Sequence, residues 1–117
     1  MTTHKEDGLS ELSVRQLRDR RRRAARRAPD LETVIAGSLQ NQRRRCGKEG
    51  CRCARGELHG PYLYLSLRVG RRTQMVYVPA ELADEVGQAV TANAEAQAAL
   101  AEISAINLEF LRRGKLG

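Results

Sequence analysis

All three cysteines of the chain and one of its two histidines lie within fourteen residues. Their spacing is C-x4-C-x-C-x5-H, with glycines between the candidate ligands. Thiolate and imidazole groups at such short spacing are typical of a tetrahedral zinc site. Glycine lets the backbone turn tightly enough to direct several side chains at one ion. We therefore predict a zinc ion bound by Cys46, Cys51, Cys53 and His59.

Four protein ligands complete the coordination of zinc, so the predicted site is structural rather than catalytic. Lys48, Arg52 and Arg55 would offset the formal negative charge of three thiolates and one imidazole around the ion. A unit between residues 38 and 79 spans about 40 residues, close to the size below which metals or partners are usually needed for stability. The small core is a second reason to expect the metal.

Other chemistry for these cysteines stays open. Cys51 and Cys53 could form a redox pair, because flanking arginines lower the pKa of a thiol, although the sequence has no C-x-x-C motif. A Cys53–His59 nucleophile pair lacks an evident orienting Asp or Asn. A metal-dependent enzyme or nuclease would need an open coordination position. The sequence holds neither a deaminase signature nor a phosphate-binding glycine loop, and we expect a protein without catalytic activity.

The net charge of +7 is unevenly distributed. Residues 1–60 hold 15 Lys and Arg against 8 Asp and Glu, whereas residues 61–117 hold 6 of each kind. Between Arg15 and Arg55 the count is 14 against 4. Such asymmetry is typical of proteins that bind a polyanion, with nucleic acid ahead of a membrane surface. An arginine-rich solvated surface in a basic proteome is the alternative.

The N-terminal region combines a helix signal with dense arginine. Ser13-Val-Arg-Gln16 resembles a capping box, which predicts a helix that ends near Ala28, before Pro29. Arginines surround this helix and leave only a weak apolar stripe. We expect it to pack poorly by itself, or to form fully on a polyanion or a partner, after a disordered tail over residues 1–8 that includes an incidental His4.

Arginine donates planar, paired hydrogen bonds to phosphate, so the arginine-rich segments are predicted to contact a nucleic-acid backbone. The candidate residues are Arg20, Arg21, Arg22, Arg23, Arg26, Arg27, Arg43, Arg44, Arg45, Arg52, Arg55, Arg71 and Arg72.

The middle of the chain predicts a β-hairpin. Residues 62–69 and 73–78 both alternate polar and apolar side chains, and Gly70-Arg71-Arg72 lies between them. Upstream, Asp30 can cap a short helix over residues 31–36 that ends at Gly37, and residues 38–45 are expected to be extended.

Tyr62 and Tyr64 fall on the polar face of the first hairpin strand. Exposed tyrosines beside arginines can stack on unpaired bases. More commonly, such tyrosines cover a metal site or pack beneath a helix, and we expect that arrangement here.

A proline-free segment rich in Ala, Glu and Gln runs from Ala80 to about Arg113. It predicts a helix of about 33 residues and roughly 50 Å. Its 4-3-4-3 spacing places Asn93 and Asn107 at coiled-coil interface positions, which favours a homodimer through residues 80–113. Packing on the chain's own N-terminal helix, with the asparagines exposed, is the alternative. The spaced positions are Leu82, Val86, Ala89, Asn93, Ala96, Leu100, Ile103, Asn107 and Phe110.

Three stretches together resemble an uncharacterised bacterial domain family. They are Gly37-Ser-Leu39, the pattern C-G-K-x-x-C-R-C-A-x-G-x-x-H-G-P-Y over residues 46–62, and Tyr77-Val-Pro79. Members look alike from about residue 31 to residue 113, and some carry a transposase-like label or lie near mobile elements. The resemblance implies no established activity, but it makes the cysteine and histidine cluster look like the family signature. The turn at residues 70–73 departs from the family's usual Gly-Lys-Thr, and the arginines before residue 30 lie outside the resemblance.

These patterns predict an α+β protein with a small zinc-knuckle and β-hairpin head, N-terminal helices and a long C-terminal helix, with a coiled-coil dimer as one assembly. Residues 1–29 would form a basic, partly disordered N-terminal helix, and residues 30–113 a zinc-binding domain. We expect non-catalytic binding of nucleic acid, DNA before RNA, accessory to mobile elements or regulation. A protein-interaction adaptor acting through the C-terminal helix is the alternative. Residues 1–10 are polar and charged and no long apolar run follows, so we expect a cytoplasmic protein without a membrane or small-molecule partner.

Overall fold

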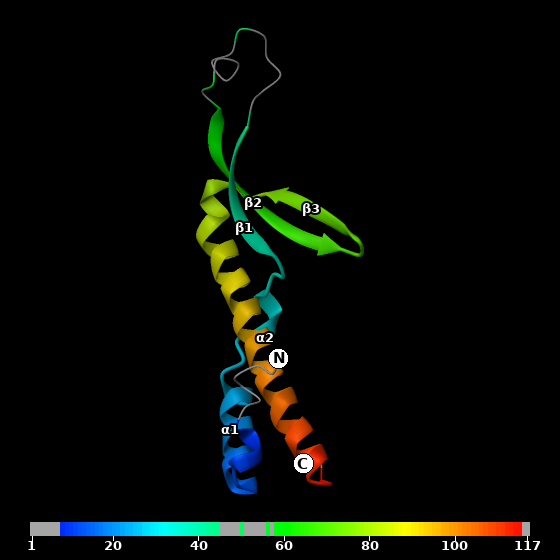
Figure 1. Ribbon diagram of the computed structural model, residues 1–117. Helices are drawn as coiled ribbons and strands as arrows, with labels where there is room; N and C mark the ends of the chain where they lie inside the picture. Colours follow the sequence, from blue (N-terminus) through cyan, green and yellow to red (C-terminus); the bar gives the residue numbers. More distant parts are fainter. Residues whose placement is uncertain (1–7, 45–49, 51–55, 57, 116–117) are drawn as a thin grey trace. The chain divides into compact units, whose positions relative to one another are not determined.

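The computed structural model describes residues 8–44, 50, 56 and 58–115 (Figure 1). Its α+β architecture confirms the predicted class and the long C-terminal helix. The helices are α1 (Val14–Arg26) and α2 (Ala83–Arg112), and the strands are β1 (Ser38–Arg44), β2 (His59–Val69) and β3 (Arg72–Tyr77). The described residues also form three short 3-10 turns, η1 (Leu9–Glu11), η2 (Leu31–Thr33) and η4 (Ala80–Leu82).

The chain divides into two compact units. The helical unit combines the chain up to Thr33 with the residues from Ala92 onward, and the sheet unit runs from Val34 to Thr91. Helix α2 contributes residues to both units.

The capping box at the start of α1 is confirmed. The Ser13 hydroxyl accepts a hydrogen bond from the Gln16 backbone N–H at 3.1 Å, and the Gln16 side-chain oxygen accepts one from the Ser13 N–H at 2.9 Å. Two backbone donors that the first helical turn would leave unpaired are thereby satisfied. The helix ends at Arg26, close to the predicted end before Pro29.

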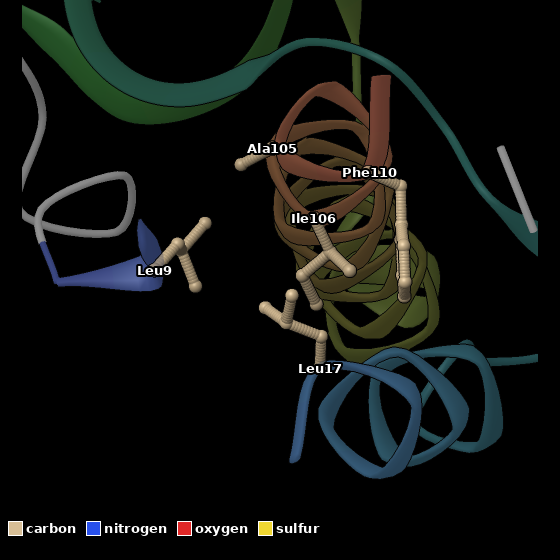
Figure 2. Close-up of a cluster of buried hydrophobic side chains, with 5 residues drawn as sticks. All are labelled: Leu9, Leu17, Ala105, Ile106 and Phe110. Atoms are coloured by element: carbon tan, nitrogen blue, oxygen red, sulfur yellow. The ribbon is translucent and has the colours of Figure 1, made fainter. Parts of the chain in front are cut away.

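A small hydrophobic cluster forms the core of the helical unit (Figure 2). Leu9 from η1 and Leu17 from α1 meet side chains of α2, and all are buried. The α2 members are Ala105, Ile106 and Phe110. Burying a large apolar side chain contributes about 1.5–3 kcal/mol. Contrary to the expectation of poor packing, α1 is fully formed against α2, because its few apolar residues coincide on one face.

One arginine joins the two ends of the helical unit. Nε of Arg113 donates to the carboxylate of Glu109 at 2.8 Å, and this glutamate is only 6% exposed. Nη2 of Arg113 donates to the backbone carbonyls of Leu9, Ser10 and Leu12 at 3.1, 3.2 and 2.6 Å. The guanidinium therefore compensates a buried negative charge and satisfies the carbonyls around η1.

The three strands form an antiparallel sheet in the order β1-β2-β3. The predicted hairpin is confirmed as β2 and β3, with Gly70 and Arg71 in the turn. The β1–β2 register shifts between Gln42 and Arg44, where Gly60 and Pro61 of β2 lie opposite the single residue Arg43 of β1. Gly60 has a φ of +111°, and a Cβ there would lie 2.9 Å from the Gln42 carbonyl oxygen, so this bulge requires glycine.

One face of the sheet is apolar. Leu39, Leu65 and Val76 are direct cross-strand neighbours, and Leu65 is 7% exposed. A Cβ at Gly87 of α2 would meet the Leu39 Cδ1 atom at 3.9 Å. Buried Ala89, whose carbonyl accepts from the Ile35 N–H at 3.1 Å, adds to this contact. The first part of α2 therefore packs on the apolar face within the sheet unit.

The helix predicted over residues 31–36 is wrong beyond its first turn. Only Leu31–Thr33 forms a 3-10 turn, in which the Asp30 side chain accepts from the Glu32 N–H at 3.0 Å. Gly37 does not end a helix but leads into β1 with a φ of +150°. A Cβ there would lie 2.7 Å from the Ser66 carbonyl oxygen, so glycine lets the chain approach β2 closely.

The C-terminal half of α2 buries part of the predicted stripe together with residues outside it. Ala96 and Phe110 of the stripe are buried in the helical unit with Ala105 and Ile106, whereas Leu100, another of the spaced positions, is 60% exposed. Asn107 accepts a hydrogen bond from Nη1 of Arg21 at 2.7 Å. Within this unit α2 packs on the chain's own α1, the alternative arrangement, except that Asn107 is hydrogen-bonded.

None of the helices in the described part of the chain is long and apolar enough to span a membrane.

Replacing Gly37 should test the close approach of β1 to β2. We expect Gly37→Ala to lower the free energy of unfolding by about 1–3 kcal/mol, because the methyl group clashes with backbone and the φ is unfavourable. Gly87→Ala is the matched control in α2, where alanine meets only an ordinary contact and should stabilise by up to about 1 kcal/mol. Tyrosine emission during chemical denaturation reports the unfolding of the sheet, since every tyrosine lies in β2 or β3. Equal stability of the two variants would contradict this role of Gly37.

Candidate nucleic-acid interface

Helix α1 carries seven arginines and one aspartate, and Arg27 follows at its C-cap. The positions of these eight arginines divide them into two sets. The first set lies on the exposed face of the helix. Residues 15, 18, 22 and 26 follow the three- and four-residue spacing that places side chains on one helical face, and residue 23 lies beside them. We call this exposed set the outer arginine face: Arg15, Arg18, Arg22, Arg23 and Arg26.

Asp19 is the only carboxylate within α1. In the described part of the chain, no ion pair joins a carboxylate to the outer arginine face. The exposed Asp19 shares this side of the helix with the five guanidinium groups, so a single carboxylate offsets them in part and the side stays strongly positive. This geometry suits the regularly spaced phosphates of a nucleic-acid backbone.

The second set of arginines faces α2. Arg27 pairs with the carboxylate of Glu102, and Nη2 of Arg20 lies 3.6 Å from the same carboxylate. The guanidinium carbon of Arg21 lies 4.8 Å from the centroid of the Phe110 ring, in cation–π geometry. These three predicted phosphate ligands are therefore engaged in the helical unit.

Four more of the predicted arginines lie at the two ends of the sheet. Arg43 is exposed in β1, and its Nη1 donates to the Gly60 carbonyl at 3.4 Å. Arg44 is the last residue of β1. Arg71 in the turn and Arg72 at the start of β3 are both exposed. Arg45, Arg52 and Arg55 lie outside the described residues.

The predicted zinc ligands fall mostly outside the described residues, which exclude Cys46, Cys51 and Cys53. His59 is described, and it opens β2 as the cross-strand partner of Arg44. The segment that carries the cysteines thus begins and ends at neighbouring positions of the sheet. The described residues alone contain no group of three or more potential ligands.

Two residues of the outer arginine face, Arg15 and Arg18, were not predicted. They share the spacing of Arg22 and Arg26, so periodicity in the sequence contained the signal.

The comparisons with known proteins give one match. The model of a family described as a domain of unknown function, DUF6788, matches residues 14–88. The matched region includes α1 and the whole sheet and ends early in α2. The resemblance expected from the sequence ran instead from about residue 31 to residue 113. The arginine-rich helix therefore belongs to the matched region. No curated protein and no solved structure matches the chain.

Proposed function

The chain belongs to the DUF6788 family, a domain of unknown function, and we propose that it is a non-catalytic, zinc-containing protein that binds nucleic acid, DNA in particular. The observation that carries the proposal is the outer arginine face of α1. Arginines that faced α2 would be explained by packing alone, as Arg20, Arg21 and Arg27 are. The five on the outer face are exposed and form no ion pair with a carboxylate among the described residues, so ion pairing in the helical unit does not account for them.

The zinc ion is proposed to be held by Cys46, Cys51, Cys53 and His59. The pairing of Arg44 with His59 supports this, because it brings the two ends of the cysteine segment together at one end of the sheet. A structural ion there would close the connection between β1 and β2 and fix the arginines around it.

Metal content should test the zinc site directly. We expect native mass spectrometry and metal analysis of the intact protein to find one zinc per chain, because three thiolates and one imidazole complete its coordination. The variants Cys46→Ser and His59→Ala should both lose the metal. His4→Ala is the matched control and should keep it. Full zinc retention in His59→Ala would refute this ligand set.

Salt-dependent binding should test the nucleic-acid interface. We expect the affinity for duplex DNA to fall steeply with salt, as counterions released by phosphate contacts require. The double variant Arg22→Gln/Arg26→Gln should reduce the slope of log affinity against log salt by about 2, with unchanged thermal stability.

Arg20→Gln/Arg27→Gln is the matched control, because it removes the same charge from the face packed on α2. It should change the salt slope less and lower the melting temperature, since Glu102 loses its partners. Equal effects of the two variants on the slope would show that net charge alone governs binding. Wild-type binding that is weak and indifferent to salt would contradict the function itself.

A second candidate, a protein-interaction adaptor or homodimer through residues 80–113, has its own support. Leu100, Leu108 and Leu111 are 60, 42 and 61% exposed. Their spacing of eight and three residues places them on one side of α2. Removing α1 is not a clean test of this surface, because Leu17 is part of the core around Phe110.

Substituting the exposed leucines should separate this candidate from the first. If the surface mediates self-association, Leu100→Gln/Leu108→Gln/Leu111→Gln should convert a dimer to a monomer in sedimentation experiments, because the apolar contact is lost. Leu31→Gln, at a leucine that is 63% exposed outside α2, should leave the dimer intact. A wild-type protein that is monomeric at every concentration tested would contradict the dimer.

A further inference from the structure

All three tyrosines of the chain gather on one face of the sheet. The ring centroid of Tyr77 lies 5.8 Å from that of Tyr64 and 6.3 Å from that of Tyr62. Both pairs are edge-to-face, with interplanar angles of 66° and 74°. Tyr64 and Tyr77 are direct cross-strand partners, so the register of β2 and β3 creates the cluster. We call these three residues the tyrosine face.

The tyrosine face lies on the opposite side of the sheet from the residues that contact α2. Side chains alternate between faces along a strand, and Leu65 and Val76 are the sequence neighbours of Tyr64 and Tyr77. Those two residues align with Leu39, which meets the α2 region around Gly87. Tyr62 and Tyr77 remain 37 and 53% exposed. The tyrosines therefore do not pack beneath α2, although packing beneath a helix was one of the arrangements expected for Tyr62 and Tyr64.

The surroundings of the tyrosine face are polar and basic. Gln40 pairs with Tyr64, and Ser66 and Met75 are paired on the same face. Arg68 and Thr73 pair at the end nearer the turn, where Nη2 of Arg68 donates to the Arg71 carbonyl at 3.5 Å. Strands β1, β2 and β3 contain no Asp or Glu, and Arg68 lies on the tyrosine face, whereas Arg72, the partner of Val69, lies on the opposite face.

Exposed aromatic rings beside polar and basic side chains fit unpaired bases better than they fit a duplex or an apolar protein surface. Aromatic side chains stack on exposed base faces, whereas the bases of a duplex already stack on one another. Amide and hydroxyl groups can hydrogen-bond base edges. Arginines beside the rings attract phosphates, and the absence of carboxylates from the strands leaves nothing there to repel them.

We propose that the tyrosine face binds single-stranded nucleic acid, with bases stacked on Tyr62 and Tyr77 and phosphates held by Arg68 on the same face and by Arg71 in the adjoining turn. This inference rests on the proposed function, and it adds a strand-specific site to the backbone contacts of α1. Duplex would bind the outer arginine face, and unpaired bases would bind the sheet.

The chain itself supplies a selective probe. It has no tryptophan and its three tyrosines form this face, so its intrinsic emission reports the proposed site alone. Titration of the full chain with an oligothymidylate of about 12 nucleotides should quench this emission, after correction for nucleotide absorption, because stacked bases quench tyrosine. A duplex of equal length should bind, as judged by anisotropy of a labelled strand, with little quenching.

Variants at the exposed rings complete the test. Tyr62→Leu and Tyr77→Leu should each weaken oligothymidylate binding at least about fivefold and leave duplex binding unchanged. Tyr62→Phe and Tyr77→Phe keep the ring and should keep the affinity. The Phe variants also control for effects on the sheet, which circular dichroism of every variant would monitor.

The outcomes separate this inference from the function on which it rests. Wild-type binding to neither probe would overturn both. Duplex binding with no oligothymidylate quenching, or Leu variants that bind oligothymidylate normally, would overturn the tyrosine face alone. Self-association that the Leu variants abolish, with unchanged oligonucleotide binding, would show that a second copy occupies the face and would also overturn it.

Discussion

The helical unit depends on the buried pair of Glu109 and Arg113. A carboxylate that is 6% exposed would cost several kcal/mol without a cation, and Arg113 supplies that cation while donating to three backbone carbonyls at η1. The same contacts hold Leu9 in the cluster beside Phe110 and Ile106. Because the apolar core is so small, the hydrogen bonds of Arg113 and the hydrophobic cluster together position α1 on α2.

The orientation of α1 decides which of its arginines are available. Once Leu17 and Ala24 are buried, helical periodicity turns Arg20, Arg21 and Arg27 toward Glu102, Asn107 and Phe110. The remaining arginines must then face outward. Arginines adjacent in the sequence therefore differ in their surroundings, because some pack on α2 and the others are exposed on the outer face.

The sequence predicted the features that local patterns determine. The Ser13–Gln16 capping box, the alternation along β2 and β3 and the long C-terminal helix all follow from short-range rules. The predicted helix after Asp30 was too long, because Gly37 leads into strand β1 and lies close to Ser66 of β2 instead of ending a helix. The cluster of Tyr77 with Tyr62 and Tyr64 depends on pairing between strands, which no single segment specifies. The proposed zinc ligands rest on spacing and on the position of His59, and most of them lie outside the described residues.

The placement of the carboxylates explains how a chain with 14 acidic residues can still present strongly positive surfaces. In the helical unit, Glu102 and Glu109 are bound to arginines by ion pairs. In the sheet unit, Asp84 and Glu85 lie in the first turn of α2, where the helix dipole favours negative charge. These four acids lie where they stabilise helices, and in the described residues none of them forms an ion pair with the outer arginine face, where Asp19 is the carboxylate of α1. The polyanion binding that we propose for this face would therefore leave the ion pairs of Glu102 and Glu109 in place.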